Sequence, residues 1–308
     1  MKRKNKMKKL YLALVGAAAF AFSGGAPAAD LPVKVSAKAE VPKVSGVIGS
    51  FLGATWVSGE ERDGSITNSV KSSQWIYGGE GRVNWWFAPN WSVQTDLEAE
   101  GTGQHQDSGD GRIMGTVGKH LTWRDPNRGA LGIFGGYTMA NLLHRNGSAS
   151  RTFFGGEGQL YLGNFTLYGQ GSGTWFHNGT NHAEWDDAWF IRGIARWFIT
   201  PNDKLQGEVG YASGRNRADQ GDPNVVNWGV LYERNKFMAT PFSAYIEYAG
   251  FKYKDSSHVA AHVTENLVMV GMKIYFNHDT LLANDRTGAT FDMPKFMRAQ
   301  AWSDYIGH

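Results

Sequence analysis

The chain has no cysteine among its 308 residues. Disulfide cross-links, a catalytic thiol and a lipid anchor on an N-terminal cysteine are therefore excluded. Long apolar runs are also scarce: the longest covers residues 10–22, and no other approaches the roughly 18 residues that a membrane-spanning helix needs. Any insertion of this chain into a membrane must therefore use β-strands.

The amino terminus has the three parts of a secretory signal peptide. Six of the first nine residues are basic, residues 10–22 are apolar, and the sequence SGGAPAAD follows. We expect export and removal of residues 1–29, with cleavage after Ala28 or Ala29. Removing six of the 31 basic residues leaves 25 against 28 acidic ones. We expect no nucleic-acid partner for such a chain, because that binding needs a basic surface.

Prolines are few, and none interrupts an alternating segment between residues 46 and 276. They mark turns instead: Pro-Asn pairs occur at 89–90, 126–127 and 201–202, and a Gly-Asn pair at 163–164. These pairs are 37, 37 and 38 residues apart, and Pro241 follows after 40. Proline presets φ, whereas asparagine and glycine tolerate a positive φ. A period near 37 residues indicates a repeated structural unit.

Each repeat contains two alternating segments, which gives twelve predicted strands: 46–57, 74–87, 91–100, 112–123, 130–143, 151–162, 165–177, 187–198, 204–214, 224–234, 242–253 and 264–276. Short connections at 88–90, 124–129, 163–164, 199–203 and 235–241 alternate with longer polar ones at 58–73, 101–111, 144–150, 178–186, 215–223 and 254–263. This pattern predicts an all-β fold, an antiparallel up-and-down transmembrane β-barrel. Its short turns and both termini are expected in the periplasm, and its longer loops outside the cell.

A secreted β-propeller is the structural alternative, because its blades also repeat about every 40 residues. A blade needs four strands of about five or six residues each. Here one apolar stripe continues from Trp75 to Phe87, and strands of 9–11 residues suit a bilayer. Aromatic residues also adjoin both classes of connection, as in the two girdles of a membrane barrel. They are Trp85, Phe87, Trp91, Trp123, Trp197 and Phe242 beside short turns, and Trp75, Tyr77, Trp175 and Trp189 beside longer loops. These features favour the barrel.

The stretch WSVQTDLEAE at 91–100 carries three acids on one face and an apolar stripe on the other. If the apolar stripes face lipid, the polar residues face the lumen by parity. The predicted pore-lining residues are Glu80, Arg82, Asp96, Glu98, Glu157, Arg192, Arg196, Glu208 and Glu247. They either pair and fill a narrow lumen, or line a water-filled path and set its ion preference. An excess of acids favours a weakly cation-preferring channel for small hydrophilic solutes.

Two other functions stay open. A closed structural or adhesive barrel would act through loops 58–73 and 101–111, and a lipid-modifying enzyme is the third alternative. The chain has no G-x-S-x-G and no H-E-x-x-H motif. The acidic loops HNGTNHAEWDD at 177–187 and DSGDG at 107–111 match no complete ligand pattern. We therefore expect no enzyme activity, no metal site and no cofactor.

The last predicted strand, ENLVMVGMKIYF, has an apolar face and ends in an aromatic residue. It resembles the C-terminal β-signal of bacterial outer-membrane proteins, which implies that Ile274 and Phe276 are read by the barrel-assembly machinery. The sequence AADLPVKVSAKAEVPK at 28–43 resembles the leader and linker of alphaproteobacterial porin-like outer-membrane proteins. This resemblance implies a bacterial outer-membrane location, contact with outer-membrane lipid and lipopolysaccharide, and passive passage of small hydrophilic solutes. Porins often trimerise, but the sequence shows no oligomer interface.

One feature departs from that family: 32 residues follow Phe276. The predicted organisation is a signal peptide (1–29), a periplasmic linker (30–45), a barrel (46–276) and a periplasmic C-terminal tail (277–308). Terminal segments are often disordered, so a loosely ordered extension is one interpretation. The other is that the tail folds against or into the periplasmic mouth, because its apolar residues are unusual in a disordered segment. These are Phe291, Met293, Phe296, Met297, Trp302 and Tyr305.

Overall fold

The computed structural model describes residues 41–63, 66–103, 112–142, 148–178, 185–216, 224–239, 241–254 and 259–294. The predicted signal peptide, most of the predicted linker, the DSGDG sequence and the end of the tail, including Trp302, lie outside the described residues. Six residues of the HNGTNHAEWDD sequence, 179–184, also lie outside them.

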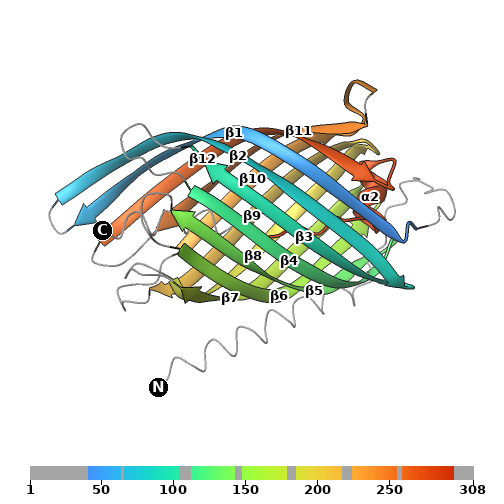
Figure 1. The fold of residues 1–308 in the computed structure, drawn as a ribbon, viewed down its shortest axis with the longest axis horizontal. Helices are drawn as coiled ribbons and strands as arrows, with labels where there is room; N and C mark the ends of the chain where they lie inside the picture. The colour runs from blue at the N-terminus through green and yellow to red at the C-terminus, as the bar shows by residue number, and fades with distance from the viewer. Residues whose placement is uncertain are drawn as a thin grey trace, which may run out of the picture. The chain divides into compact units, whose positions relative to one another are not determined.

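Twelve antiparallel strands close into a barrel, each paired with its neighbours in sequence, while β12 pairs with β1 (Figure 1). The strands are β1 (Val44–Asp63), β2 (Ile66–Ala88), β3 (Trp91–Thr102), β4 (Arg112–Asp125), β5 (Gly129–Leu142), β6 (Ser148–Leu162), β7 (Phe165–Asn178), β8 (Trp185–Thr200), β9 (Asp203–Asn216), β10 (Asn224–Arg234), β11 (Phe242–Lys254) and β12 (Val259–Phe276). A 3-10 turn, η1 (Phe237–Ala239), and a short helix, α2 (Leu281–Thr287), complete the described structure. The predicted fold is confirmed.

The alternation of side chains along the strands separates an apolar exterior from a polar interior. Along β3, Leu97 is 62% exposed, whereas the neighbouring Asp96 is fully buried. The aromatic stripe of β2 also points outward, with Trp75 66% exposed. Successive side chains of a strand point to opposite faces, so a closed sheet sends one parity to each side. An apolar outer face around a polar lumen is the arrangement of outer-membrane barrels.

The first hairpin is longer than predicted. The ladder of β1 and β2 continues from Val57 opposite Ser72 to Asp63 opposite Ile66, so the prediction of a loop over 58–73 is wrong. The amino end of β12 also extends along β1, with Val259 opposite Asp63. The sequences GEERD and ITNSVKSS are polar at nearly every position. Backbone hydrogen bonds form this ladder, and an apolar period of two is not needed for them.

The turns follow the predicted chemistry. Asn90 adopts φ 64° and Gly163 adopts φ 62°, in the left-handed region that these two residue types tolerate.

Of the helices that the structure describes, none is both long enough and apolar enough to span a membrane.

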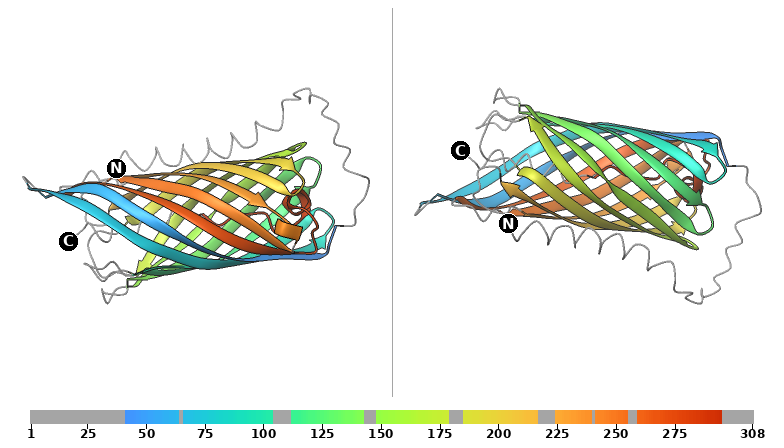
Figure 2. Two further views of the ribbon diagram at one scale, coloured as in Figure 1. Left: turned by 90° about the horizontal axis from the view of Figure 1, so that it is seen from above. Right: turned by 90° about the horizontal axis from the view of Figure 1, so that it is seen from below.

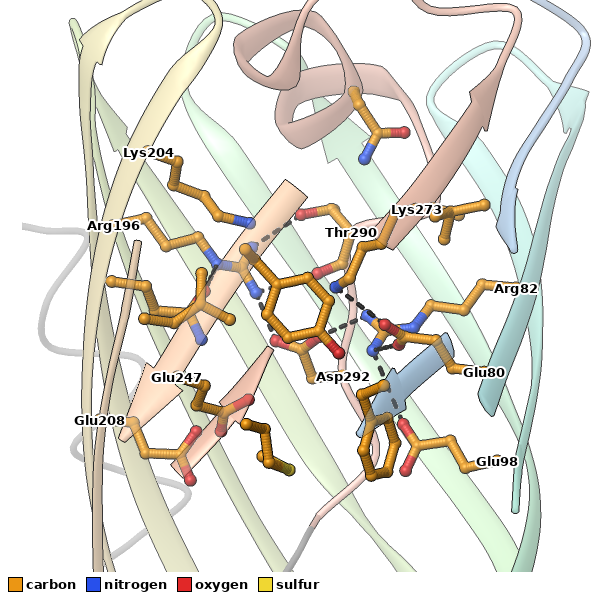
Figure 3. Close-up of a pocket in the computed structure, with 18 of the residues that line it drawn as sticks. Glu80, Arg82, Glu98, Arg196, Lys204, Glu208, Glu247, Lys273, Thr290 and Asp292 are labelled. Atoms are coloured by element: carbon orange, nitrogen blue, oxygen red, sulfur yellow. Dashed lines mark hydrogen bonds and ion pairs between the residues drawn. The ribbon is translucent and has the colours of Figure 1, made fainter. Parts of the chain in front are cut away.

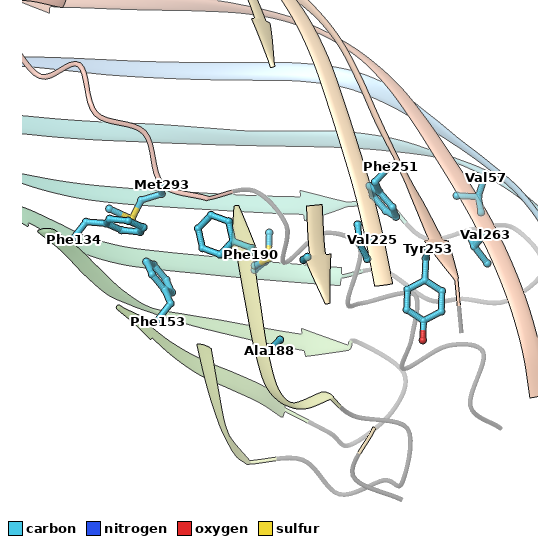
Figure 4. Packing of buried hydrophobic residues seen from close by; sticks show 12 residues of the cluster. Val57, Phe134, Phe153, Ala188, Phe190, Val225, Phe251, Tyr253, Val263 and Met293 are labelled. Atoms are coloured by element: carbon cyan, nitrogen blue, oxygen red, sulfur yellow. The ribbon is translucent and has the colours of Figure 1, made fainter. Parts of the chain in front are cut away.

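The barrel interior has two parts. Toward the ends of the strands that adjoin the longer connections, the inner wall is apolar (Figure 4). Its cluster comprises Val57, Met114, Phe134, Phe153, Ala188, Phe190, Ala212, Val225, Phe251, Tyr253, Val263 and Met293. Toward the short turns the wall carries charged side chains, and α2 lies inside the rim at that end (Figure 2). This charged part forms the candidate site.

Candidate functional site: a charged lumen that holds the C-terminal segment

Residues 277–294, here called the C-terminal segment, fold back into the barrel after β12. Asn277 reverses the chain with φ 63°, and its side-chain amide donates to the Val44 carbonyl at 2.9 Å. The Thr280 hydroxyl caps α2 by accepting a hydrogen bond from the Ala283 amide at 3.1 Å. Beyond α2 the chain extends along the lumen, where Phe291 is fully buried. The described part of the tail therefore folds into the barrel mouth.

Three arginines bind this segment at Asp292, as Figure 3 shows for two of them. Arg82 of β2 bonds one carboxylate oxygen of Asp292, and Arg196 of β8 bonds the other at 2.6 Å. Arg192, four residues before Arg196 on the same face of β8, donates to the Asp292 carbonyl oxygen at 2.7 Å. Gln170 donates to the same carbonyl at 2.9 Å. We call Arg82, Arg192 and Arg196 the arginine site.

Asp285 on α2 is a second anchor. The Arg196 Nη1 lies 2.8 Å from Asp285 Oδ1, and the Thr166 hydroxyl donates to Asp285 Oδ2 at 2.6 Å. The neighbouring Arg286 donates to the Gly163 carbonyl at 2.8 Å, which ties α2 to the turn between β6 and β7. Arg196 thus contacts two of the three carboxylates of the segment, those of Asp285 and Asp292.

Phe291 supplies the apolar contact between these polar anchors. Its ring stacks on His120 at 5.5 Å between centroids, and the Arg124 guanidinium lies 4.8 Å from the ring centroid. Tyr168 meets it edge-on at 5.9 Å. The Phe291 backbone is held by Gln94, whose amide donates to its carbonyl at 2.7 Å and accepts from its N–H at 3.2 Å. The segment is therefore bound through backbone, ring and charge together.

A buried polar cluster lies directly beneath Phe291. His120 Nδ1 is 2.7 Å from Glu157 Oε1, and His120 Nε2 is 3.4 Å from Asp96 Oδ2. Tyr168 and Gln170 donate to Glu157 Oε2 at 2.7 and 2.8 Å. Asp96 and Glu157 thus face the interior, but their carboxylates belong to the wall that Phe291 covers. Parity alone could not separate such wall groups from groups that reach the cavity.

A cavity lies beside the C-terminal segment. Seven of the predicted pore-lining residues line it: Glu80, Arg82, Glu98, Arg192, Arg196, Glu208 and Glu247. Several of these charges are paired, such as Glu80 with Lys273 at 2.8 Å and Glu208 with Arg192 at 3.6 Å. Among the described lining residues seven are acidic and five basic, and two of the acids, Asp285 and Asp292, belong to the C-terminal segment.

Asp285 and Asp292, the two acids of the segment that line the cavity, stay ionised in this environment. Burial by itself raises the pKa of Asp292, but Arg82, Arg196 and Arg192 outweigh it and hold the pKa well below its usual value. Burial likewise raises the pKa of Asp285, while Arg196 and Arg286 lower it further than burial raises it. Both carboxylates are therefore negative wherever the segment is docked near neutral pH.

The negative charge of Asp292 makes the stability of the docked segment depend on pH. Because the pKa of Asp292 is lowered in the docked state, its carboxylate makes its full contribution to stability at pH values above its ordinary pKa of 3.8. This contribution is lost as the pH falls through the lowered pKa. The difference in free energy of unfolding between the wild type and Asp292→Asn should therefore be constant from about pH 8 to about pH 5 and shrink below about pH 4. Urea titrations at several pH values would measure it. A difference that shrinks already near neutral pH would contradict the assigned charge state.

The proposed assembly signal lies on β12. Phe276 is 43% exposed on the outer surface, and Ile274 pairs with Ile48 of β1 and Phe242 of β11. Recognition of these two residues by the assembly machinery stays a prediction.

Comparisons with known proteins agree with the fold. No protein-family model and no curated protein sequence matches the chain. Among solved structures it resembles the COG4313 outer membrane channel from Pseudomonas putida F1, with 15% identity, coverage of 78% of this chain and 99% of that one, and a TM-score of 0.54. It also matches the translocator domain of autotransporter NalP from Neisseria meningitidis, with 9% identity, coverage of 78% and 90%, and a TM-score of 0.49. At such low identity the first likeness shows a shared barrel fold, and the second carries no argument.

Proposed function

We propose that the protein is a channel of the bacterial outer membrane through which small hydrophilic solutes diffuse passively, with a weak preference for cations. One observation carries the proposal: a closed barrel with an apolar exterior contains a cavity lined by charged side chains. Charged side chains on a channel wall bias which ions enter it. The surplus of acids among the described lining residues supports the preference for cations.

The proposal includes a location and partners. The apolar strand faces would contact outer-membrane lipid, and the longer connections would meet lipopolysaccharide on the cell surface. Ile274 and Phe276 would present the chain to the barrel-assembly machinery. Both termini would lie in the periplasm, so that the C-terminal segment enters the lumen from the periplasmic mouth.

The C-terminal segment forms the constriction of the proposed channel. A barrel of twelve strands is intermediate between small barrels filled by side chains and large barrels that leave an open channel. In this barrel the Asp292 carboxylate connects arginines on β2 and β8, and the segment occupies the lumen between them. Solutes would therefore pass beside the segment, or pass only after the segment has left the lumen.

Single-channel recording in a planar bilayer tests this function. Refolded mature protein should give small, weakly cation-selective steps. A version that ends at Phe276 should give larger steps without cation preference, because the acids and bases that line the cavity are then equal in number, five of each. Circular dichroism and the heat-dependent gel mobility of folded barrels would establish that both samples are folded. Silence from two folded samples would overturn the channel proposal.

A closed structural or adhesive barrel is the second candidate. The observation that favours it is the dense docking of the C-terminal segment in the lumen, with Phe291 and Met293 fully buried. The long β1–β2 hairpin would then be its contact surface. Conduction by the mature protein in the same recording would exclude a permanently closed barrel.

A further inference from the structure

The arginine site holds a carboxylate from its own chain in a geometry that suits a free ligand. We propose that the arginine site recognises short dicarboxylates: Asp292 occupies it while the C-terminal segment is docked, and a dicarboxylate solute occupies it when Asp292 is withdrawn. This inference rests on the proposed channel function for its biological meaning, but the binding site can be tested separately.

The three arginines differ in the carboxylates that neutralise them. Arg82 has Glu80 and Glu98 as partners on the barrel wall, and Arg192 has Glu208. Arg196 is different. Among the residues that the structure describes, its carboxylate partners are Asp285 and Asp292 of the segment. Its wall contacts are the Gln206 amide oxygen at 3.1 Å and the Tyr168 ring, whose centroid lies 5.2 Å from the guanidinium, and neither carries a negative charge.

When the segment withdraws, the guanidinium of Arg196 therefore loses both carboxylates. With the segment docked, Arg196 is only 3% exposed, so withdrawal leaves its guanidinium facing the lumen without either carboxylate. A dissolved anion that enters the lumen can supply the missing charge. The site is therefore expected to bind an anion in place of Asp292.

The arginine site contacts two oxygen-bearing groups of Asp292. Two different arginines each bond one oxygen of the Asp292 carboxylate, and Arg192 with Gln170 bonds its backbone carbonyl oxygen. These two oxygen-bearing groups are separated by the Cα and Cβ atoms of the aspartate. A four-carbon dicarboxylate such as succinate has the same spacing between its two ends. Its second carboxylate would meet Arg192 where the carbonyl now lies, and guanidinium groups bind carboxylates with favourable planar geometry.

Arg82, Arg192, Arg196 and Asp292 all line the cavity beside the segment, so the site is open to solutes within the lumen. Hydrogen bonds between guanidinium and carboxylate groups are charge-assisted and stronger than those between neutral groups. A solute held here would lie at the constriction of the proposed channel.

The experiment measures succinate binding to the refolded full-length mature chain by calorimetry in detergent. Asp292→Ala removes the internal carboxylate, so this variant should bind succinate at least about tenfold more tightly than the wild type, in which Asp292 competes. Adding Arg196→Gln to that variant should abolish binding, and the neutral analogue succinamide should not bind to either. Asp203→Ala, which alters the first residue of β9 beside a short turn, should behave like the wild type.

Equal binding by the wild type and Asp292→Ala, or binding that survives Arg196→Gln, would overturn the site. If Asp292→Ala does not fold, Asp292→Asn retains the side-chain shape, and the same comparison with its Arg196→Gln double variant decides. Conductance is recorded on the same samples: succinate should reduce the current through Asp292→Ala. Binding without any conductance would defeat the channel proposal and leave the site intact, whereas conductance without binding would do the opposite.

Discussion

The Arg196→Gln variant is expected to release the C-terminal segment from the barrel. Arg196 bonds Asp285 at 2.8 Å, Asp292 at 2.6 Å and the Thr290 carbonyl at 3.0 Å. Glutamine is shorter and neutral, so both carboxylates would stay buried without this counter-ion. Removing one partner of a buried ion pair costs about 3–5 kcal/mol. The C-terminal segment should therefore be undocked in most molecules of this variant.

The absence of cysteine makes the release measurable. Ala289 is 2% exposed in the docked segment, so a cysteine introduced there is the only thiol and is protected. In the Arg196→Gln background its alkylation should be about 100-fold faster or more, since every 1.4 kcal/mol changes the open population about tenfold. Arg234→Gln is the matched control, because Arg234 is 58% exposed and its pair with Asp203, at 3.6 Å, is a surface pair. Equal alkylation rates in the two variants would refute the role of Arg196.

The second large effect is expected from Phe291→Ala. The ring is fully buried between His120 and the Arg124 guanidinium. Truncating a buried phenylalanine to alanine costs about 3–5 kcal/mol, because burial is lost and a cavity forms. The Arg124 guanidinium would also lose its contact with the Phe291 ring and keep the more distant one with Trp86, at 5.6 Å. The segment should again detach, although every carboxylate and arginine is retained.

The same thiol at position 289 measures this variant. Alkylation should accelerate strongly in Phe291→Ala and only partly in Phe291→Leu, which refills the volume without the stacked ring. Phe154→Ala is the matched control, because Phe154 is 53% exposed on the outer surface and does not contact the segment. If Phe291→Ala left the thiol protected, the charge contacts alone would hold the segment, and the apolar contribution assigned to Phe291 would be wrong.

These two variants also separate docking from conduction. If the docked segment is the constriction, both should raise single-channel conductance toward that of the chain that ends at Phe276. If either variant frees the thiol without changing the current, the segment does not limit the path.

Local patterns in the sequence determined the strands and their direction. Alternation with a period of two over ten or more residues, with turns about 37 residues apart, predicted twelve antiparallel strands and a closed barrel. The same parity placed Arg82 and Asp96 on the inner face, because a strand that is apolar outside has no other face for a charge. The polar hairpin beyond Val57 was missed, because backbone pairing there leaves no apolar period.

Only the tertiary structure decided how the lumen is used. The Arg82–Asp292 pair joins residues 210 positions apart, and no local pattern links them. Their meeting requires first that β12 closes on β1, and then that the chain reverses at Asn277 and enters the mouth instead of leaving it. The apolar residues of the tail predicted that it would fold, but which wall Phe291 covers, and which arginines Asp292 meets, depend on the three-dimensional course of the whole barrel.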